Sequence, residues 1–131
     1  MARRKSAALT DGELRLMQVL WDSGHATVGE VVDHLPGREK PAYNTVLTIL
    51  RILERKGYVT HEKDGRAHVY VPLVDRTQAR RGALAHLLRR FFDDSPELLV
   101  LNLVEDGQVG EEELTRVRGL LRGRERNGEA R

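Results

Sequence analysis

One face of a helix predicted from about Pro41 to Lys56 carries side chains suited to recognising nucleic acid. Asn44, Thr48 and Arg51 recur at helical spacing, and Arg55 extends the same face. Amides, hydroxyls and guanidinium groups hydrogen-bond base edges and phosphate oxygens. An ordinary solvated helix would carry mainly Glu and Lys there. The pattern therefore favours a helix that contacts DNA.

The other face of this helix is apolar, which indicates how it is held. Four apolar residues repeat at the i, i+3, i+4 and i+7 spacing of an amphipathic helix: Val46, Ile49, Leu50 and Leu53. We expect Pro41 in the first helical turn, where its missing N–H has no cost. Gly57 follows a last-turn lysine and is expected to take the left-handed cap.

Two strand-like runs follow the helix directly, at residues 58–63 and 66–71, and flank the dipeptide Asp64-Gly65. That dipeptide predicts a two-residue hairpin turn. Cationic side chains and a histidine crowd the tip, where they could lie along a phosphate backbone: Lys63, Arg66 and His68. A solvated hairpin beside an ordinary surface helix is the alternative. The unbroken order of helix and hairpin favours DNA binding.

Two capping boxes predict two helices before this unit. Thr10 with Glu13 opens one and Thr27 with Glu30 opens the other. The apolar stripes expected to face inward are Leu14, Met17, Leu20 and Trp21, then Val28, Val31, Val32 and Leu35. With residues 38–40 as the turn, the order is that of a winged helix-turn-helix. The predicted DNA-contacting residues are Lys40, Tyr43, Asn44, Thr45, Thr48, Arg51, Arg55, Lys63, Arg66 and His68.

After residue 74 the chain is predicted to be helical. Asp75 or Thr77 can cap a helix to about residue 92, and Ser95-Pro96-Glu97 is a strong start signal for the next one. That next helix is apolar nearly all round, and a last helix is expected from residue 111 to about 121. Such helices need cover from more than one side, so we expect a two-fold dimer, with packing onto the same chain's winged domain as the alternative. The predicted interface residues are Leu84, Leu88, Phe91, Leu98, Leu99, Leu101, Leu103, Val104, Leu114, Val117 and Leu121.

The 131 residues therefore suit a mainly helical α+β chain with four parts. These are a basic flexible arm (1–8), a winged-helix domain (9–74), a helical dimerisation domain (75–122) and a disordered tail (123–131). The net charge of +2 argues weakly for nucleic acid, but Arg3 and Arg4 in the arm could touch phosphate. A solubilising arm is the alternative.

Several classes of function are disfavoured by composition. The chain has no cysteine, which removes disulfides and thiolate chemistry and suits a reducing cytoplasm. Its five histidines form no ligand motif; His61 and His68 could be cross-strand neighbours, but polarity of the hairpin explains them better than a metal site. No phosphate loop, nucleophile motif, signal peptide or membrane span is visible. We expect a cytoplasmic protein that is not an enzyme and needs no cofactor.

Over about residues 9–121 the chain resembles the penicillinase-repressor family, the BlaI/MecI/CopY group of bacterial transcriptional repressors. The matching stretches are Leu14 to Trp21 (LRLMQVLW), Tyr43 to Val59 (YNTVLTILRILERKGYV), Gly65 to Tyr70 (GRAHVY) and Phe92 to Glu105 (FDDSPELLVLNLVE). The resemblance implies a winged helix, a helical dimerisation domain and repression at a palindromic operator in double-stranded DNA.

The resemblance also implies a mode of control linked to antibiotic resistance. In β-lactam-responsive members a membrane sensor-metalloprotease signals and the repressor is cut in its dimerisation domain. The cut bond corresponds here to Asn102–Leu103, where members commonly have Phe at the second position. The cysteine cluster of the copper-responsive branch is absent. Two other functions stay open: a winged-helix regulator gated by a small ligand, and a winged-helix interaction module that does not bind DNA.

Overall fold

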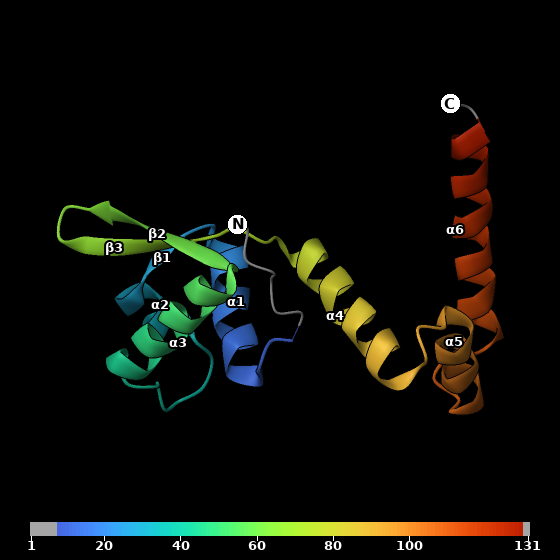
Figure 1. The fold of residues 1–131 in the computed structure, drawn as a ribbon, viewed down its shortest axis with the longest axis horizontal. Helices are drawn as coiled ribbons and strands as arrows, with labels where there is room; N and C mark the ends of the chain where they lie inside the picture. Colours follow the sequence, from blue (N-terminus) through green and yellow to red (C-terminus); the bar gives the residue numbers. More distant parts are fainter. Residues whose placement is uncertain (1–7, 130–131) are drawn as a thin grey trace. The chain divides into compact units, whose positions relative to one another are not determined.

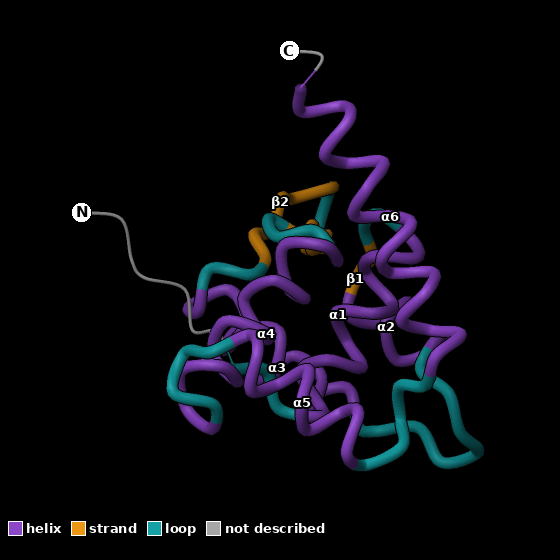
Figure 2. The backbone as a smooth tube through the Cα atoms, turned by 90° about the vertical axis from the view of Figure 1, so that its right-hand side faces the viewer, coloured by secondary structure: helices purple, strands orange, loops and turns teal. Residues whose placement is uncertain are grey.

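The computed structural model describes residues 8–129 as six helices and three short strands (Figure 1). In chain order they are α1 (Asp11–Ser23), β1 (Ala26–Thr27), α2 (Val28–His34), α3 (Tyr43–Lys56), β2 (Val59–Asp64), β3 (Ala67–Pro72), α4 (Arg76–Phe91), α5 (Pro96–Glu105) and α6 (Glu111–Glu129). Helix dominates this described part of the chain, and strand is confined there to β1 and the hairpin (Figure 2). The chain separates into two compact units, Met1–His86 and Leu87–Arg131. The predicted arm, with Arg3 and Arg4, lies outside the described residues apart from Ala8.

Both predicted capping boxes are present. The N–H of Glu13 donates to the Thr10 hydroxyl at 3.1 Å, and the N–H of Thr10 donates to the Glu13 carboxylate at 2.8 Å. The same reciprocal pair opens α2 with Thr27 and Glu30. These local bonds fix where the first two helices begin, because they satisfy N–H groups that have no partner within the helix.

Helix α3 begins later than predicted. Its N-cap is Ala42, so Pro41 precedes the helix and is not in its first turn. Pro41 instead lines a groove beside α1, while Val46 is the first fully buried residue of α3. The predicted place of Pro41 is therefore wrong, because Ala42 after it is still extended, with ψ 148°. The predicted end is confirmed, since Gly57 caps α3 in the left-handed conformation with φ 90°.

The three strands form one antiparallel sheet in the order β1-β3-β2. Asp64 pairs with Ala67, so the hairpin loop is Gly65-Arg66 and the predicted Asp64-Gly65 loop is wrong by one residue. Gly65 has φ 64°, which suits the first central position of a type II′ turn. Strand β1 was not predicted, because two residues show no period.

A single core joins α1, α2, α3 and the sheet. Its buried apolar residues are Leu16, Met17, Val19, Leu20, Ala26, Val28, Val31, Leu35, Val46, Leu50, Leu53, Tyr58, Val59, Tyr70 and Val74. Leu14 was expected inward but is 37% exposed, and Leu16 and Val19 are buried in its place. Trp21 packs at the edge of the core, as expected, and its indole N–H donates to the carbonyl of Val74 at 2.8 Å. The N-terminal part of the chain is therefore a winged helix, and the predicted mainly helical α+β class is confirmed.

The helices after the core bury little. Asp75 is the residue that caps α4, through reciprocal bonds with Gln78 at 2.8 and 2.9 Å. Ser95 caps α5 with Pro96 in its first turn, as predicted. Neither α4 nor α5 has a buried residue. Among the predicted interface residues, Leu84, Phe91, Leu101, Val104, Val117 and Leu121 are exposed in the single chain, and Leu88, Leu98, Leu99, Leu103 and Leu114 are half-buried.

Helix α6 continues to Glu129, so residues 123–129 are helical and the predicted disordered tail is wrong over this range. Arg and Glu are good helix formers, and a run rich in them extends a helix once Glu111 to Glu113 have opened it at the favourable end of the dipole. Within residues 8–129, no helix combines the length and apolarity needed to cross a membrane.

Candidate nucleic-acid interface

The polar face of α3 is exposed along its length. Tyr43, at its start, is 55% exposed, and Asn44, Thr45, Thr48, Arg51 and Arg55 are exposed too. The opposite stripe of α3 is buried in the core. Packing therefore fixes the helix from behind and leaves the predicted contact residues available to a ligand in front.

Thr48 has its own hydroxyl proton committed inside the helix. Its Oγ1 donates to the carbonyl of Asn44 at 2.9 Å. The hydroxyl oxygen can still accept a hydrogen bond, and the methyl group stays available for apolar contact. Threonine in this state suits an amino group or a thymine methyl on a base edge.

The N-terminus of α3 differs from those of α1, α2 and α5. Ala42 supplies no side-chain cap, and the first turn of α3 has no acid. Thr10, Thr27 and Ser95 do cap the other three helices. The first N–H groups of α3 therefore lack a capping side chain, and the positive end of the helix dipole favours an anion such as phosphate there.

A groove of about 280 Å³ lies between α3 and the hairpin. It is lined by Thr27, Val28, Tyr43, Leu47, Arg51, Arg66, Ala67 and His68. Four predicted contact residues from two separate elements are thus brought together: Tyr43, Arg51, Arg66 and His68. Two guanidinium groups and an imidazole around one groove form an arrangement suited to phosphate oxygens.

The wall of this groove continues into a small aromatic cluster. His61 Nδ1 lies 2.8 and 2.9 Å from the two carboxylate oxygens of Glu54 on α3. The rings of His61 and His68 stack with centroids 4.7 Å apart and planes 21° apart. They are diagonal neighbours, since His68 is directly opposite Lys63 and His61 is opposite Tyr70. The helix and the hairpin are therefore connected through Glu54 and His61.

Tyr70 forms the buried base of that cluster. Its ring lies 5.6 Å from that of His61. Burial, and after it the charge of Glu54, raises the pKa of the Tyr70 phenol above its usual value. Tyr70 therefore stays neutral at physiological pH, and the ionisable imidazoles and carboxylate lie over an uncharged support.

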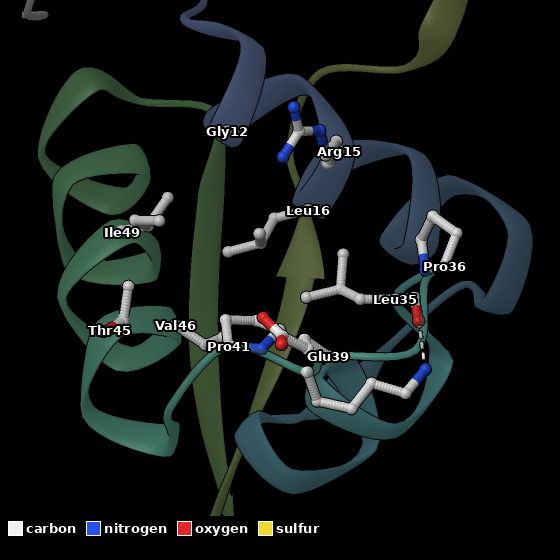
Figure 3. Close-up of a pocket in the computed structure, with 11 residues that line it drawn as sticks. Gly12, Arg15, Leu16, Leu35, Pro36, Glu39, Pro41, Thr45, Val46 and Ile49 are labelled. Carbon is white, nitrogen blue, oxygen red and sulfur yellow. Dashed lines mark hydrogen bonds between the residues drawn. The ribbon is translucent and has the colours of Figure 1, made fainter.

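Some predicted contact residues have a different setting. The Lys40 ammonium donates to the carbonyls of Leu35 and Asp33, the latter at 3.2 Å, and so holds the end of α2. Thr45 lines a second groove of about 380 Å³ between α1 and the start of α3. Figure 3 shows Leu16 and Leu35 in this second groove, with Arg15 on the α1 side. DNA contacts by Lys40 and Thr45 stay predictions.

Thr27 and Val28 line the first groove although the sequence did not point to them. They reach the groove because β1 pairs with β3, so that Thr27 lies opposite Val69. A two-residue strand leaves no pattern by which that proximity could have been found. Among residues 8–129, no three histidines or acids are grouped so that they could hold a metal ion.

Comparison with known proteins agrees with this geometry. The family model described as penicillinase repressor matches residues 9–123. The penicillinase repressor of Bacillus licheniformis is 30% identical over 118 residues, covering 90% of this chain and 92% of that protein. The transcriptional regulator BlaI of Mycobacterium tuberculosis is 33% identical over 119 residues, covering 89% of this chain and 85% of that protein.

The fold is also similar to a solved structure, the DNA-binding domain of the repressor BlaI. The two share 32% identity with a TM-score of 0.51, over 58% of this chain and 93% of that domain. The family expected from the sequence motifs is confirmed by these matches, as is the expectation that the chain is not an enzyme, because the family consists of repressors. This chain belongs to the penicillinase repressor family.

Proposed function

We propose that this chain is a DNA-binding transcriptional repressor in which α3 reads the operator and the β2–β3 hairpin acts as a wing. The observation that carries the proposal is the groove in which Tyr43 and Arg51 of α3 meet Arg66 and His68 of the hairpin. Similarity to the DNA-binding domain of the repressor BlaI supports the same function. An interaction module that had lost DNA binding would be expected to carry acids on the exposed face of α3, where this chain has amides, hydroxyls and guanidiniums.

Within this proposal, some residues contact base edges and others contact phosphates. Asn44 and Thr48 lie on the exposed face of α3 and have the groups that pair with base edges. Arg51 and Arg66 line the same groove and would neutralise phosphates on the backbone. The uncapped start of α3 at Ala42 would accept a further phosphate. Base contacts would supply specificity, and phosphate contacts would supply most of the affinity.

The working form is a homodimer joined through the C-terminal helices. Leu101, Val117 and Leu121 are 51%, 58% and 55% exposed in the single chain. Each large apolar side chain left in water forgoes about 1.5–3 kcal/mol, so a second copy that covers them gains stability. A two-fold dimer presents two α3 helices to a palindrome, and joining two weak half-site contacts raises their effective concentration.

Repression would end by cleavage at Asn102–Leu103, carried out or triggered by a membrane sensor-metalloprotease. The bond lies within α5, where the carbonyl of Asn102 accepts from the N–H of Asp106 at 3.0 Å. A protease needs an extended substrate, so α5 must open locally first. Cleavage would separate α6 from the winged helix and remove much of the dimer interface.

Selection of duplexes from a randomised library by the full chain tests the proposal. We expect a two-fold symmetric consensus whose half-site centres lie about one helical turn, or a multiple of it, apart. A single unpaired half-site would contradict the dimeric mode of reading. Failure to enrich any sequence over the starting library would contradict operator recognition itself. The chain with both Arg51→Ala and Thr48→Ala is the control that should enrich nothing.

A further inference from the structure

Two histidines of the hairpin, His61 and His68, connect α3 to the groove. Phosphate contact by the arginines alone does not require this connection. Glu54 of α3 holds His61 of β2 through both carboxylate oxygens. His61 stacks on His68, and His68 lines the groove with Arg51 and Arg66. A continuous set of contacts therefore runs from the reading helix through the wing and back to the groove.

We propose that His68 is a proton-linked phosphate ligand of this groove, positioned by His61 and Glu54, so that operator binding takes up a proton. The inference rests on the proposed function, because it concerns the same groove. His68 touches DNA, and His61 is a positioning residue that acts through His68.

The charges around His68 give the physical reason. Facing it are Arg51 from α3, Arg66 from the turn, and Lys63 directly opposite on β2. These cations would hold a phosphate next to the His68 ring. The negative charge of that phosphate would favour the imidazolium form of His68 in the complex.

The remaining groups that face the cluster are Glu54, His61, Tyr43 and Tyr70. Tyr70 stays neutral because burial raises its pKa. The Glu54 carboxylate and the His61 ring are hydrogen-bonded to each other, which holds the ring in place beside His68. Histidine is the side chain whose charge ordinarily changes between about pH 5 and pH 8. A change of operator affinity in that range would therefore point to His61 and His68.

Operator affinity of the full chain, measured at constant ionic strength from about pH 8 down to about pH 5, tests the inference. We expect affinity to rise by up to about tenfold per pH unit over part of this range, as uptake of one proton requires. His68→Gln should bind like the wild type near the upper end and lose the rise. His61→Gln and Glu54→Gln should each reduce the rise although His68 is intact, which a merely structural role would not do.

His86→Gln is the matched control, because His86 lies on α4 and does not line the groove. It should keep the full pH dependence. Calorimetry in two buffers with different ionisation enthalpies gives the proton uptake directly, and His68→Gln should abolish it. Unfolding temperatures of the glutamine variants serve to exclude loss of fold.

Two results would overturn the inference. One is a flat pH profile in the wild type; the other is a profile that His68→Gln lowers equally at every pH. In both cases the selected duplex is still bound, so the proposed repressor function stands. Absence of operator binding at every pH would instead contradict the proposed function.

Discussion

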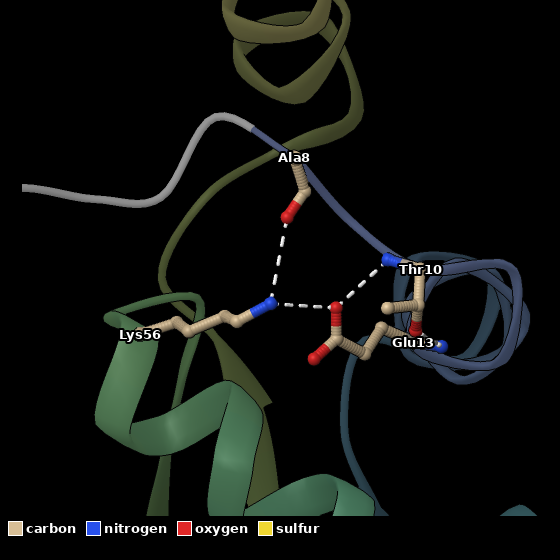
Figure 4. A network of polar contacts seen from close by, with 4 residues as sticks. All are labelled: Ala8, Thr10, Glu13 and Lys56. Carbon is tan, nitrogen blue, oxygen red and sulfur yellow. Dashed lines mark hydrogen bonds and ion pairs between the residues drawn. The ribbon is translucent and has the colours of Figure 1, made fainter.

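Lys56 Nζ lies 2.8 Å from Glu13 Oε1 and joins the last turn of α3 to the first turn of α1 (Figure 4). The same carboxylate oxygen accepts the backbone N–H of Thr10 at 2.8 Å, and the ammonium reaches the carbonyl of Ala8 at 3.5 Å. Glu13 is only 4% exposed. The C-terminal end of α3 is therefore fixed through a buried carboxylate that also completes the capping box of α1.

Replacing Lys56 by methionine should destabilise the fold by about 1–3 kcal/mol. The change leaves a buried carboxylate without its cation, and that loss would be about 3–5 kcal/mol if both groups were fully buried. The Lys56 side chain is 26% exposed, which reduces the expected cost. Urea unfolding of the wild type and of Lys56→Met measures this loss of stability. The double change Glu13→Leu with Lys56→Met should recover much of the loss; an additive loss in the double variant would contradict coupling between the pair.

Acid should weaken the fold partly through Glu13. Burial raises the pKa of its carboxyl, but hydrogen bonds from Lys56 and Thr10 and the charge of Lys56 outweigh burial and hold the pKa below the ordinary value of 4.5. Because the folded-state pKa is the lower one, this stabilisation is present above 4.5 and is lost as pH falls through the folded-state pKa.

Glu13→Gln should therefore lower the free energy of unfolding at neutral pH and flatten its decline in acid. Some decline should persist, because the pKa of Glu30 is lowered too, by the backbone N–H and the hydroxyl of Thr27. Equilibrium unfolding at a series of pH values checks this. An acid dependence identical to that of the wild type would mean that Glu13 does not contribute.

Thr48→Ala should weaken specific operator binding by about 1–3 kcal/mol and leave non-specific binding nearly unchanged. The Thr48 hydroxyl lies on the exposed face of α3. Its proton is donated to the carbonyl of Asn44, and its oxygen can still accept a hydrogen bond. Titration of the selected duplex and of a random duplex measures both quantities. Thr115→Ala on α6 is a matched control. An equal loss on both duplexes would place Thr48 away from the bases.

Arg66→Ala should reduce the salt dependence of DNA affinity. Removing one cation from a phosphate lowers the slope of log affinity against log salt by about 0.9, because one fewer set of counterions is released on binding. The measurement is a set of binding titrations at several salt concentrations, with Arg124→Ala on α6 as the control. A slope that Arg66→Ala leaves unchanged would show that the turn of the hairpin does not touch phosphate.

Leu121→Asp in the full chain, and separately truncation after Asn102, should each shift the protein from dimer to monomer and release the operator. The reason is that Leu121 and Val117 are more than half exposed in the single chain and need a partner surface. Sedimentation and operator titration measure the two effects, with Thr115→Asp on the polar side of α6 as the control. A truncated chain that still dimerises and binds tightly would contradict both the interface and the cleavage switch.

Features that depend on neighbours within a few residues could be predicted from the sequence. The capping boxes at Thr10 and Thr27, the Ser95 cap, the left-handed Gly57 and the two faces of α3 were all predicted and found. Each is specified by hydrogen bonds or periodicity inside a single element. The local pattern thus determines the order of helices and hairpin.

Features that join distant residues were decided only by the tertiary structure. Glu13 and Lys56 are 43 residues apart, and no local pattern pairs them. The pairing of β1 with β3 brings Thr27 to the groove, and one residue of register moves Arg66 into the hairpin loop. Packing of the core fixes these relations, because burying Val46, Leu50 and Tyr70 together leaves few arrangements of helix against sheet. The sequence determined which face of α3 is exposed, and the packed core decided which residues of that face lie beside the hairpin.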